Sequence, residues 1–138
     1  MLMVFTYRFP EVAELIQVCW LEIRGKINTS MLSPSILYTA NLVFKFSIYA
    51  SGFDDQPVKV AMKLDGDMIC AHTIFWNEDS DGHYPRERGD GWLEIELGDF
   101  FCMEGEDGEL EMSVFDGTKN WKHGLIVEGI AIRPKDGN

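Results

Sequence analysis

The sequence of 138 residues predicts an all-β fold, an antiparallel β-sandwich, on three observations. Apolar and polar residues alternate along most segments, and successive side chains of an extended chain face opposite sides of a sheet. Turn-forming residues separate these segments, and hardly any stretch has helical spacing. Seven or so such strands, joined by polar turns, are typical of two sheets that pack face to face.

Two parts are expected along the chain. Residues 1–18 form an N-terminal extension, which is apolar enough to pack along the domain or onto a second subunit. Within it, residues 10–16 have the features of a short helical turn, because Pro10 suits the first helical position and acids lie nearby. Residues 19–138 form the binding domain, whose first strand is expected at residues 20–27.

The middle of the chain continues the strand pattern. Residues 37–48 alternate and place Phe44, Phe46 and Ile48 on the apolar side. Residues 58–64 and 68–76 are expected to pair as a hairpin, since Asp65 and Gly66 between them are a turn signal. A long polar loop is expected to follow at residues 77–90.

Three further strands are expected at residues 92–97, 109–115 and 125–132. The first alternates most strictly, with Leu93, Ile95 and Leu97 directed to a core. In the last, Gly129 marks a bulge or a close approach of the backbone. The residues that face water on the first of these strands are Trp92, Glu94 and Glu96.

The negative net charge argues against nucleic acids and anionic membranes as partners of this chain. The chain has 23 acidic and 12 basic residues, a formal charge of −11, which repels phosphate backbones and anionic membranes. Direct nucleic-acid binding is therefore not expected. No segment suits a bilayer span or a secretory signal, so membrane insertion is not expected either, and the expected location is cytoplasmic or nucleocytoplasmic. Cys19, Cys70 and Cys102 lack paired spacing, which indicates reduced thiols rather than a disulfide framework or metal site.

Several longer motifs follow one another along the chain: VAEL at 12–15, WLEIRGKI at 20–27, LVFK at 42–45, DGWLEIELGDFF at 90–101, GEDGELEM at 105–112, WKHGLIVEGI at 121–130 and IRP at 132–134. In this order they resemble the plant phloem lectins, the phloem protein 2 or Nictaba-type family. The resemblance runs from about residue 11 to 135, with a divergent stretch at roughly 51–88. Ordered motifs of this length are more specific than one short pattern.

The resemblance implies a jelly-roll-like sandwich that binds oligomers of N-acetylglucosamine and the cores of N-glycans, in phloem transport or defence. Catalysis is not expected, because the acids crowd exposed faces and no apolar pocket is evident that would raise the pKa of one of them, and no cofactor is expected. It also implies two acidic binding positions, which match Glu109 and Asp116. Family members of the tobacco type depend on tryptophans ahead of VAEL, and this chain has none there. Trp76 and Tyr84 in the divergent stretch are the candidate replacements.

Sugar binding needs an exposed aromatic ring beside carboxylates and amides. Trp92 with its neighbouring acids meets this requirement on one strand. A turn at 116–120 presents further groups at a loop tip, and the candidate contacts there are Asn120, Trp121 and Lys122. The alternative is that both tryptophans are half-buried sandwich residues and the acids are a solvated face.

A structural or adaptor role is the alternative function. The resemblance associates these lectins with a disulfide-linked phloem filament protein, and Cys19 and Cys102, which lie near segment ends, are the candidates for an intermolecular disulfide. A homodimer is expected, with residues 1–18 and Trp20 as the candidate contact. An upstream degradation-adaptor domain, known in some relatives, is expected to be absent.

Overall fold

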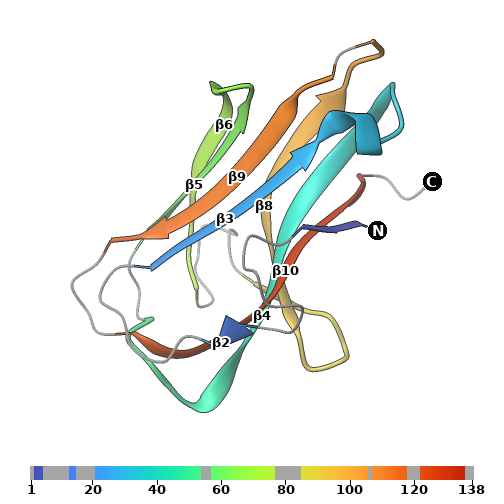
Figure 1. Ribbon diagram of the computed structural model, residues 1–138. Helices are drawn as coiled ribbons and strands as arrows, with labels where there is room; N and C mark the ends of the chain where they lie inside the picture. Colours follow the sequence, from blue (N-terminus) through green and yellow to red (C-terminus); the bar gives the residue numbers. More distant parts are fainter. Residues whose placement is uncertain are drawn as a thin grey trace.

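The computed structural model describes residues 2–4, 13–14, 21–53, 57–76, 85–105, 107–117 and 122–135. Most of these residues lie in strands, and the strands form two sheets packed against each other (Figure 1). The first sheet has the order β1 (Leu2–Val4), β10 (His123–Pro134), β4 (Ile36–Ser51), β8 (Leu93–Cys102) and β7 (Arg86–Glu87), with β2 (Ala13–Glu14) also paired to β10. The second has the order β3 (Leu21–Asn28), β9 (Glu109–Asp116), β5 (Val58–Leu64) and β6 (Asp67–Ile74).

The order of the strands is that of a jelly roll. All the strand pairs are antiparallel. The chain changes sheet between β2 and β3, β3 and β4, β4 and β5, and β6 and β7, and again at both ends of β9. Two four-stranded orders, β1-β10-β4-β8 and β3-β9-β5-β6, therefore face each other as in a double Greek key. The predicted fold class is confirmed.

Alternation along the strands accounts for the core. Buried and exposed residues alternate through β3 and through most of β9, whose inward residues Leu110, Met112 and Val114 are fully buried. The central strand β4 departs from this pattern, because residues 40–44 are all buried. A strand in the middle of a sheet with both faces covered is expected to be buried on both sides.

The predicted strands are all present, with shifted ends. The hairpin turn at Asp65 and Gly66 joins β5 to β6, and the register of β10 against β4 shifts between Val127 and Gly129, as a bulge there predicts. β4 extends three residues past the expected end, to Ser51.

Three expectations are corrected. Ala13–Glu14, within the expected helical turn, pairs as a strand with residues 126–127, and the rest of that turn lies outside the described residues. The expected loop 77–90 contains the short strand β7, which pairs with the start of β8. Ile48 was expected on the apolar side of its strand, but it is 89% exposed. The extension at 1–18 as a separate part, and Trp20 as a dimer contact, stay predictions.

Within the described part of the chain, none of the helical turns has the length and apolar character that a bilayer crossing requires.

Candidate functional site

A buried polar triad lies at one end of the sandwich. It consists of Trp76, which follows β6, Asp116, the last residue of β9, and Lys122, which directly precedes β10. Trp76 Nε1 donates to Asp116 Oδ2 at 2.8 Å, and Lys122 Nζ lies 3.5 Å from Asp116 Oδ1. All three side chains are almost fully excluded from solvent. The two Asp116 oxygens are therefore each engaged, one by a neutral donor and one by a cation.

The triad joins the residues from which two connecting segments start. Trp76 directly precedes residues 77–84, whereas Asp116 and Lys122 lie on either side of residues 118–121. Joining these three side chains therefore places the starting points of both segments next to each other. The predicted contacts Tyr84, Asn120 and Trp121 belong to these segments and lie outside the described residues.

A cluster of four aromatic rings supports the triad. Trp76 packs edge-on against Phe44 and Phe53, with ring centroids 5.3 and 5.6 Å apart, and Phe46 lies 5.0 Å from Phe53. Edge-to-face pairs at these distances are favourable, and the indole N–H is satisfied by Asp116. The hydrophobic core therefore extends as far as the triad, because Phe44, Phe53 and Trp76 belong to it and Phe46 packs against it.

The burial of the triad corrects the expectation of open contact groups. Trp76, Asp116 and Lys122 were predicted to face a sugar, but their side chains reach solvent hardly at all. The alternation of β9 already contained the reason, because Asp116 has the same parity as the inward Leu110 and Val114. A buried carboxylate is tolerated there because a lysine and an indole N–H compensate its charge.

Glu109 lies at the opposite end of the same strand. It is exposed, its backbone N–H donates to Asp65 Oδ1 at 2.8 Å, and its carboxylate lies 3.8 Å from Lys26 Nζ. Along a strand that rises by about 3.3 Å per residue, Glu109 and Asp116 are roughly 23 Å apart. The structure does not bring the two acids together around one monosaccharide.

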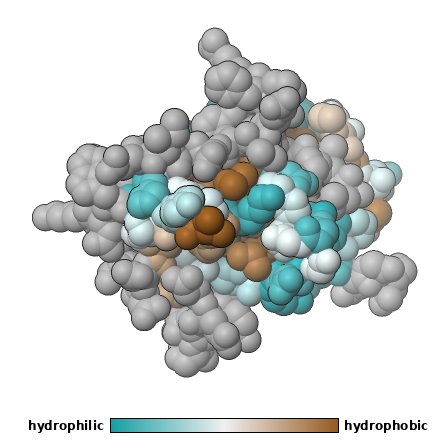
Figure 2. Space-filling view, turned by 90° about the horizontal axis from the view of Figure 1, so that it is seen from below, coloured by the Kyte–Doolittle hydropathy of each residue, from teal (hydrophilic) through white to brown (hydrophobic). Residues whose placement is uncertain are grey.

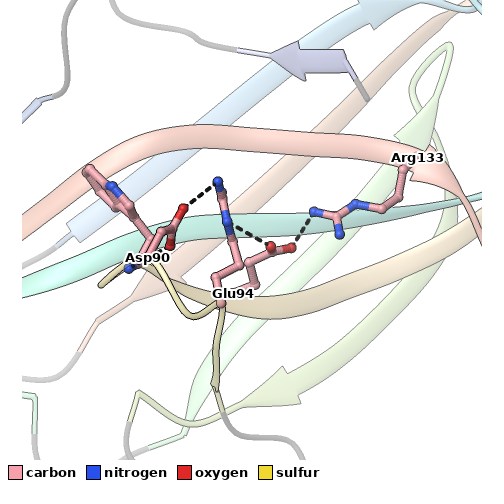
Figure 3. A network of polar contacts seen from close by, with 5 residues as sticks. Asp90, Glu94 and Arg133 are labelled. Atoms are coloured by element: carbon pink, nitrogen blue, oxygen red, sulfur yellow. Dashed lines mark hydrogen bonds and ion pairs between the residues drawn. The ribbon is translucent and has the colours of Figure 1, made fainter.

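Trp92 lies on the outer face of the first sheet, within a charged network. Its half-buried ring is covered by Lys45, whose Nζ is 4.5 Å from the ring centroid. Glu94 accepts from Arg133 at 2.5 Å and lies 3.5 Å from Arg88, which in turn pairs with Asp90 at 2.8 Å (Figure 3). Sequence reasoning missed the pair of Arg133 with Glu94, because the two residues come from strands that are far apart in the sequence.

The expected exposure of Glu94 is also corrected. The alternation predicted that it faces water, but its side chain is 9% exposed, because two guanidinium groups cover it. Glu96, two residues further along the strand, is exposed as predicted. The indole of Trp92 is therefore flanked by one neutralised acid and covered by a cation, which makes it a poorer stacking surface than a bare ring.

Replacing Glu94 by glutamine is expected to lower the free energy of unfolding by about 1–3 kcal/mol, because two arginines lose a charge-assisted partner. Glu96→Gln on the same strand is the matched control, with a change within about 0.5 kcal/mol. Urea unfolding followed by circular dichroism measures both. Equal midpoints for the two variants would contradict the network's contribution.

The described thiols are poorly placed for chemistry. Cys102 is 4% exposed, and its Sγ lies 3.9 Å from the Thr29 carbonyl oxygen. Burial raises the pKa of the Cys70 thiol, and the carboxylates of Asp99 and Glu96 raise it further. Cys19 lies outside the described residues. No group of histidine, cysteine and acidic residues in the described part of the chain has the arrangement of a metal site.

Comparison with known proteins gives one family. A family model described as phloem protein 2 matches residues 4–134. Among curated relatives from Arabidopsis thaliana, the putative F-box protein PP2-B12 is 44% identical over 132 residues, which cover 94% of this chain and 51% of that protein. F-box protein PP2-B10 is 41% identical, covering 92% of this chain and 50% of that protein. The chain thus spans about half the length of these relatives.

Two solved structures are similar at low identity. The insecticidal delta-endotoxin Cry8Ea1 from Bacillus thuringiensis is 11% identical, with a TM-score of 0.45 over 87% of this chain and 19% of the toxin. The C-terminal domain of EclA, described as a sugar-binding protein, is 13% identical, with a TM-score of 0.38 over 94% of this chain and 81% of that domain.

Proposed function

The chain belongs to the phloem protein 2 family, and on this basis we propose that it is a carbohydrate-binding domain for oligomers of N-acetylglucosamine and N-glycan cores. The observation that carries the proposal is the buried triad. It joins the residues that adjoin segments 77–84 and 118–121 in the chain. These segments contain the predicted contacts Tyr84, Asn120 and Trp121. Recognition requires such groups on a rigid support.

In this mechanism the triad positions the site and does not touch the sugar. An N-acetylglucosamine ring stacks its C–H face on the indole of Trp121, and the amide of Asn120 holds a hydroxyl or acetamido group. Asp116 and Lys122 keep the segment between them at a fixed span. A shallow site of this kind binds weakly, so a homodimer formed through residues 1–18 supplies avidity.

The two acids that the family resemblance assigns to the site favour binding without cleavage. A glycosidase needs two carboxyl groups about 5–10 Å apart on either side of the scissile bond. Asp116 is buried with both oxygens engaged, and Glu109 lies at the far end of β9. These two acids therefore suit an acid–base pair badly, and we propose a lectin without enzymatic activity.

The test is a titration of the protein with chitotriose, followed by tryptophan fluorescence. We expect saturable quenching, lost in Trp121→Ala and retained in Glu109→Ala, whose side chain is remote from the triad. Glu109→Ala also tests the position that the family resemblance assigns, because loss of binding in that variant would move the site to the other end of β9. A flat response of the wild type at millimolar sugar would refute the function.

The alternative, a disulfide-linked phloem adaptor, makes a different prediction for the thiols. In a Cys19→Ser variant, we expect a thiol-reactive disulfide reagent at pH 8 to modify the native protein at least tenfold more slowly than the urea-unfolded protein. The thiolate is the reactive form: at Cys70 a raised pKa lowers its population, and at Cys102 burial limits the access of the reagent. Rapid modification of Cys102 in the native protein would favour the adaptor.

The names of the relatives suggest a second role. They are F-box proteins about twice as long as the matched region. We propose that, in a protein of that length, this domain supplies the half that recognises glycoproteins. Glycoprotein capture by the full-length relative PP2-B10 is expected to be competed by free chitotriose, and capture that is insensitive to the sugar would contradict this role.

A further inference from the structure

The pairing of β4 with β10 contains a wide bulge. Ser51 is paired with His123 and Phe46 with Leu125, so residues 47–50 all stand opposite Gly124. Gly124 has φ +85, and a Cβ on it would lie 2.6 Å from the Cα of Ala50 and from Ser47 Oγ. Only glycine lets the bulge lie this close to β10. We call residues 47–51 the β4 bulge.

The β4 bulge places two large side chains in solvent. Ile48 is 89% and Tyr49 77% exposed, the largest fractions among the exposed large hydrophobic residues of the described chain. Two hydrogen bonds fix the bulge: Tyr49 N–H donates to Ser47 Oγ at 3.3 Å within it, and Ser51 Oγ lies 3.1 Å from His123 Nδ1 and joins its end to β10. Ile48 and Tyr49 are therefore exposed on a backbone that is tied to β10.

The β4 bulge adjoins the triad's end of the molecule. Phe46 directly precedes it and Phe53 follows it, and both rings belong to the aromatic cluster around Trp76. His123, its partner on β10, directly follows Lys122 of the triad. Figure 2 views the molecule from the end to which β4 extends in Figure 1, and apolar atoms gather there among hydrophilic ones.

The chemistry of the bulge suits a neutral, amphipathic ligand. Residues 47–51 carry no charge, although the chain as a whole has a formal charge of −11. The bulge combines the aromatic ring of Tyr49 and the aliphatic side chain of Ile48 with the hydroxyl groups of Ser47 and Ser51, and the imidazole of His123 pairs with it. A pyranose has the matching pattern of C–H patches and hydroxyls, whereas a stable protein contact needs a much larger apolar area.

We propose that Tyr49 is a stacking platform for a second pyranose ring of the oligosaccharide, with Ser47, Ser51 and His123 as its hydrogen-bonding groups. Ile48 contacts the acetamido methyl group. This inference rests on the proposed function and adds the β4 bulge to the proposed site. It adds specificity for oligomers over single sugars, because a second ring of the oligosaccharide gains contacts of its own.

Calorimetric titration with chitotriose tests the platform in four proteins. Relative to the wild type, Tyr49→Ala is expected to weaken binding about fivefold to tenfold, while Tyr49→Phe, which keeps the ring, stays within about twofold. Phe101→Ala is the matched control, because Phe101 is 51% exposed at the opposite end of the β4–β8 ladder and its variant should bind like the wild type. Urea midpoints should be unchanged in both Tyr49 variants.

The outcomes separate the platform from the function. If the wild type binds chitotriose and Tyr49→Ala binds equally well, the platform is overturned and the lectin function stands. If Phe101→Ala weakens binding as much as Tyr49→Ala, the ring has no special position and the platform is again overturned. If the wild type does not bind at millimolar chitotriose, both proposals fall.

Discussion

Asp116→Ala is expected to lower the free energy of unfolding by about 3–5 kcal/mol. The variant removes the Asp116 carboxylate from beside the buried Lys122 ammonium and takes away the acceptor of the Trp76 N–H. Removing one partner of a buried ion pair costs far more than the pair contributes, because a buried charge that loses a counter-charge is poorly solvated in a medium of low dielectric constant. Urea unfolding, monitored by circular dichroism, measures the change.

Glu109→Ala is the matched control on the same strand. The side chain of Glu109 is 60% exposed and its ion pair with Lys26 is long, so its removal should change stability by no more than about 0.5 kcal/mol. Asp116→Asn is an intermediate case, because it keeps an oxygen for the indole but loses the charge. Equal losses for the Asp116 and Glu109 alanine variants would contradict the buried triad.

Trp76→Ala is expected to cost about 3–5 kcal/mol, because it removes the ring around which three phenylalanines pack. Trp76→Phe should cost less, about 1–3 kcal/mol, since most ring contacts remain and mainly the hydrogen bond to Asp116 is lost. Thermal and urea unfolding both measure these changes. If Trp76→Phe were as damaging as Trp76→Ala, the contribution of the ring contacts would be refuted.

Trp92→Ala is the comparison for a tryptophan outside the core. Its ring is half-buried and its specific contact is the Lys45 ammonium, which is worth about 0.5–1 kcal/mol at an exposed site. Its loss of stability should therefore be clearly smaller than that of Trp76→Ala. A larger loss would mean that the outer face of the first sheet, and not the triad, is the more firmly packed region.

The strands could be predicted because one face of each is buried and the period of two is strict. The clearest case is β9, whose alternation places Leu110, Met112 and Val114 inward. The same period, followed one step further, puts Asp116 inside, where the family resemblance suggested an open contact. Local pattern and functional analogy disagreed at this residue, and the pattern was the better guide to burial.

The rest depended on contacts between distant segments. Glu94 is buried because Arg88 and Arg133 reach it, and the sequence does not show that β10 and β8 lie on either side of β4. Ile48 continues the apolar alternation of its strand, but a bulge opposite Gly124 turns it outward. The sequence shows a glycine at position 124, but it does not show that residues 47–50 of β4 lie opposite it.

The most direct test of the central claim is amide chemical-shift mapping of the ¹⁵N-labelled protein during titration with chitotriose. A site at the triad's end of the sandwich predicts shifts concentrated in residues 47–51 and 117–123. Little change is expected around Glu109, at the opposite end of β9, or around Asp65, which accepts a hydrogen bond from Glu109. Shifts centred on Glu109, or none at millimolar sugar, would contradict the account.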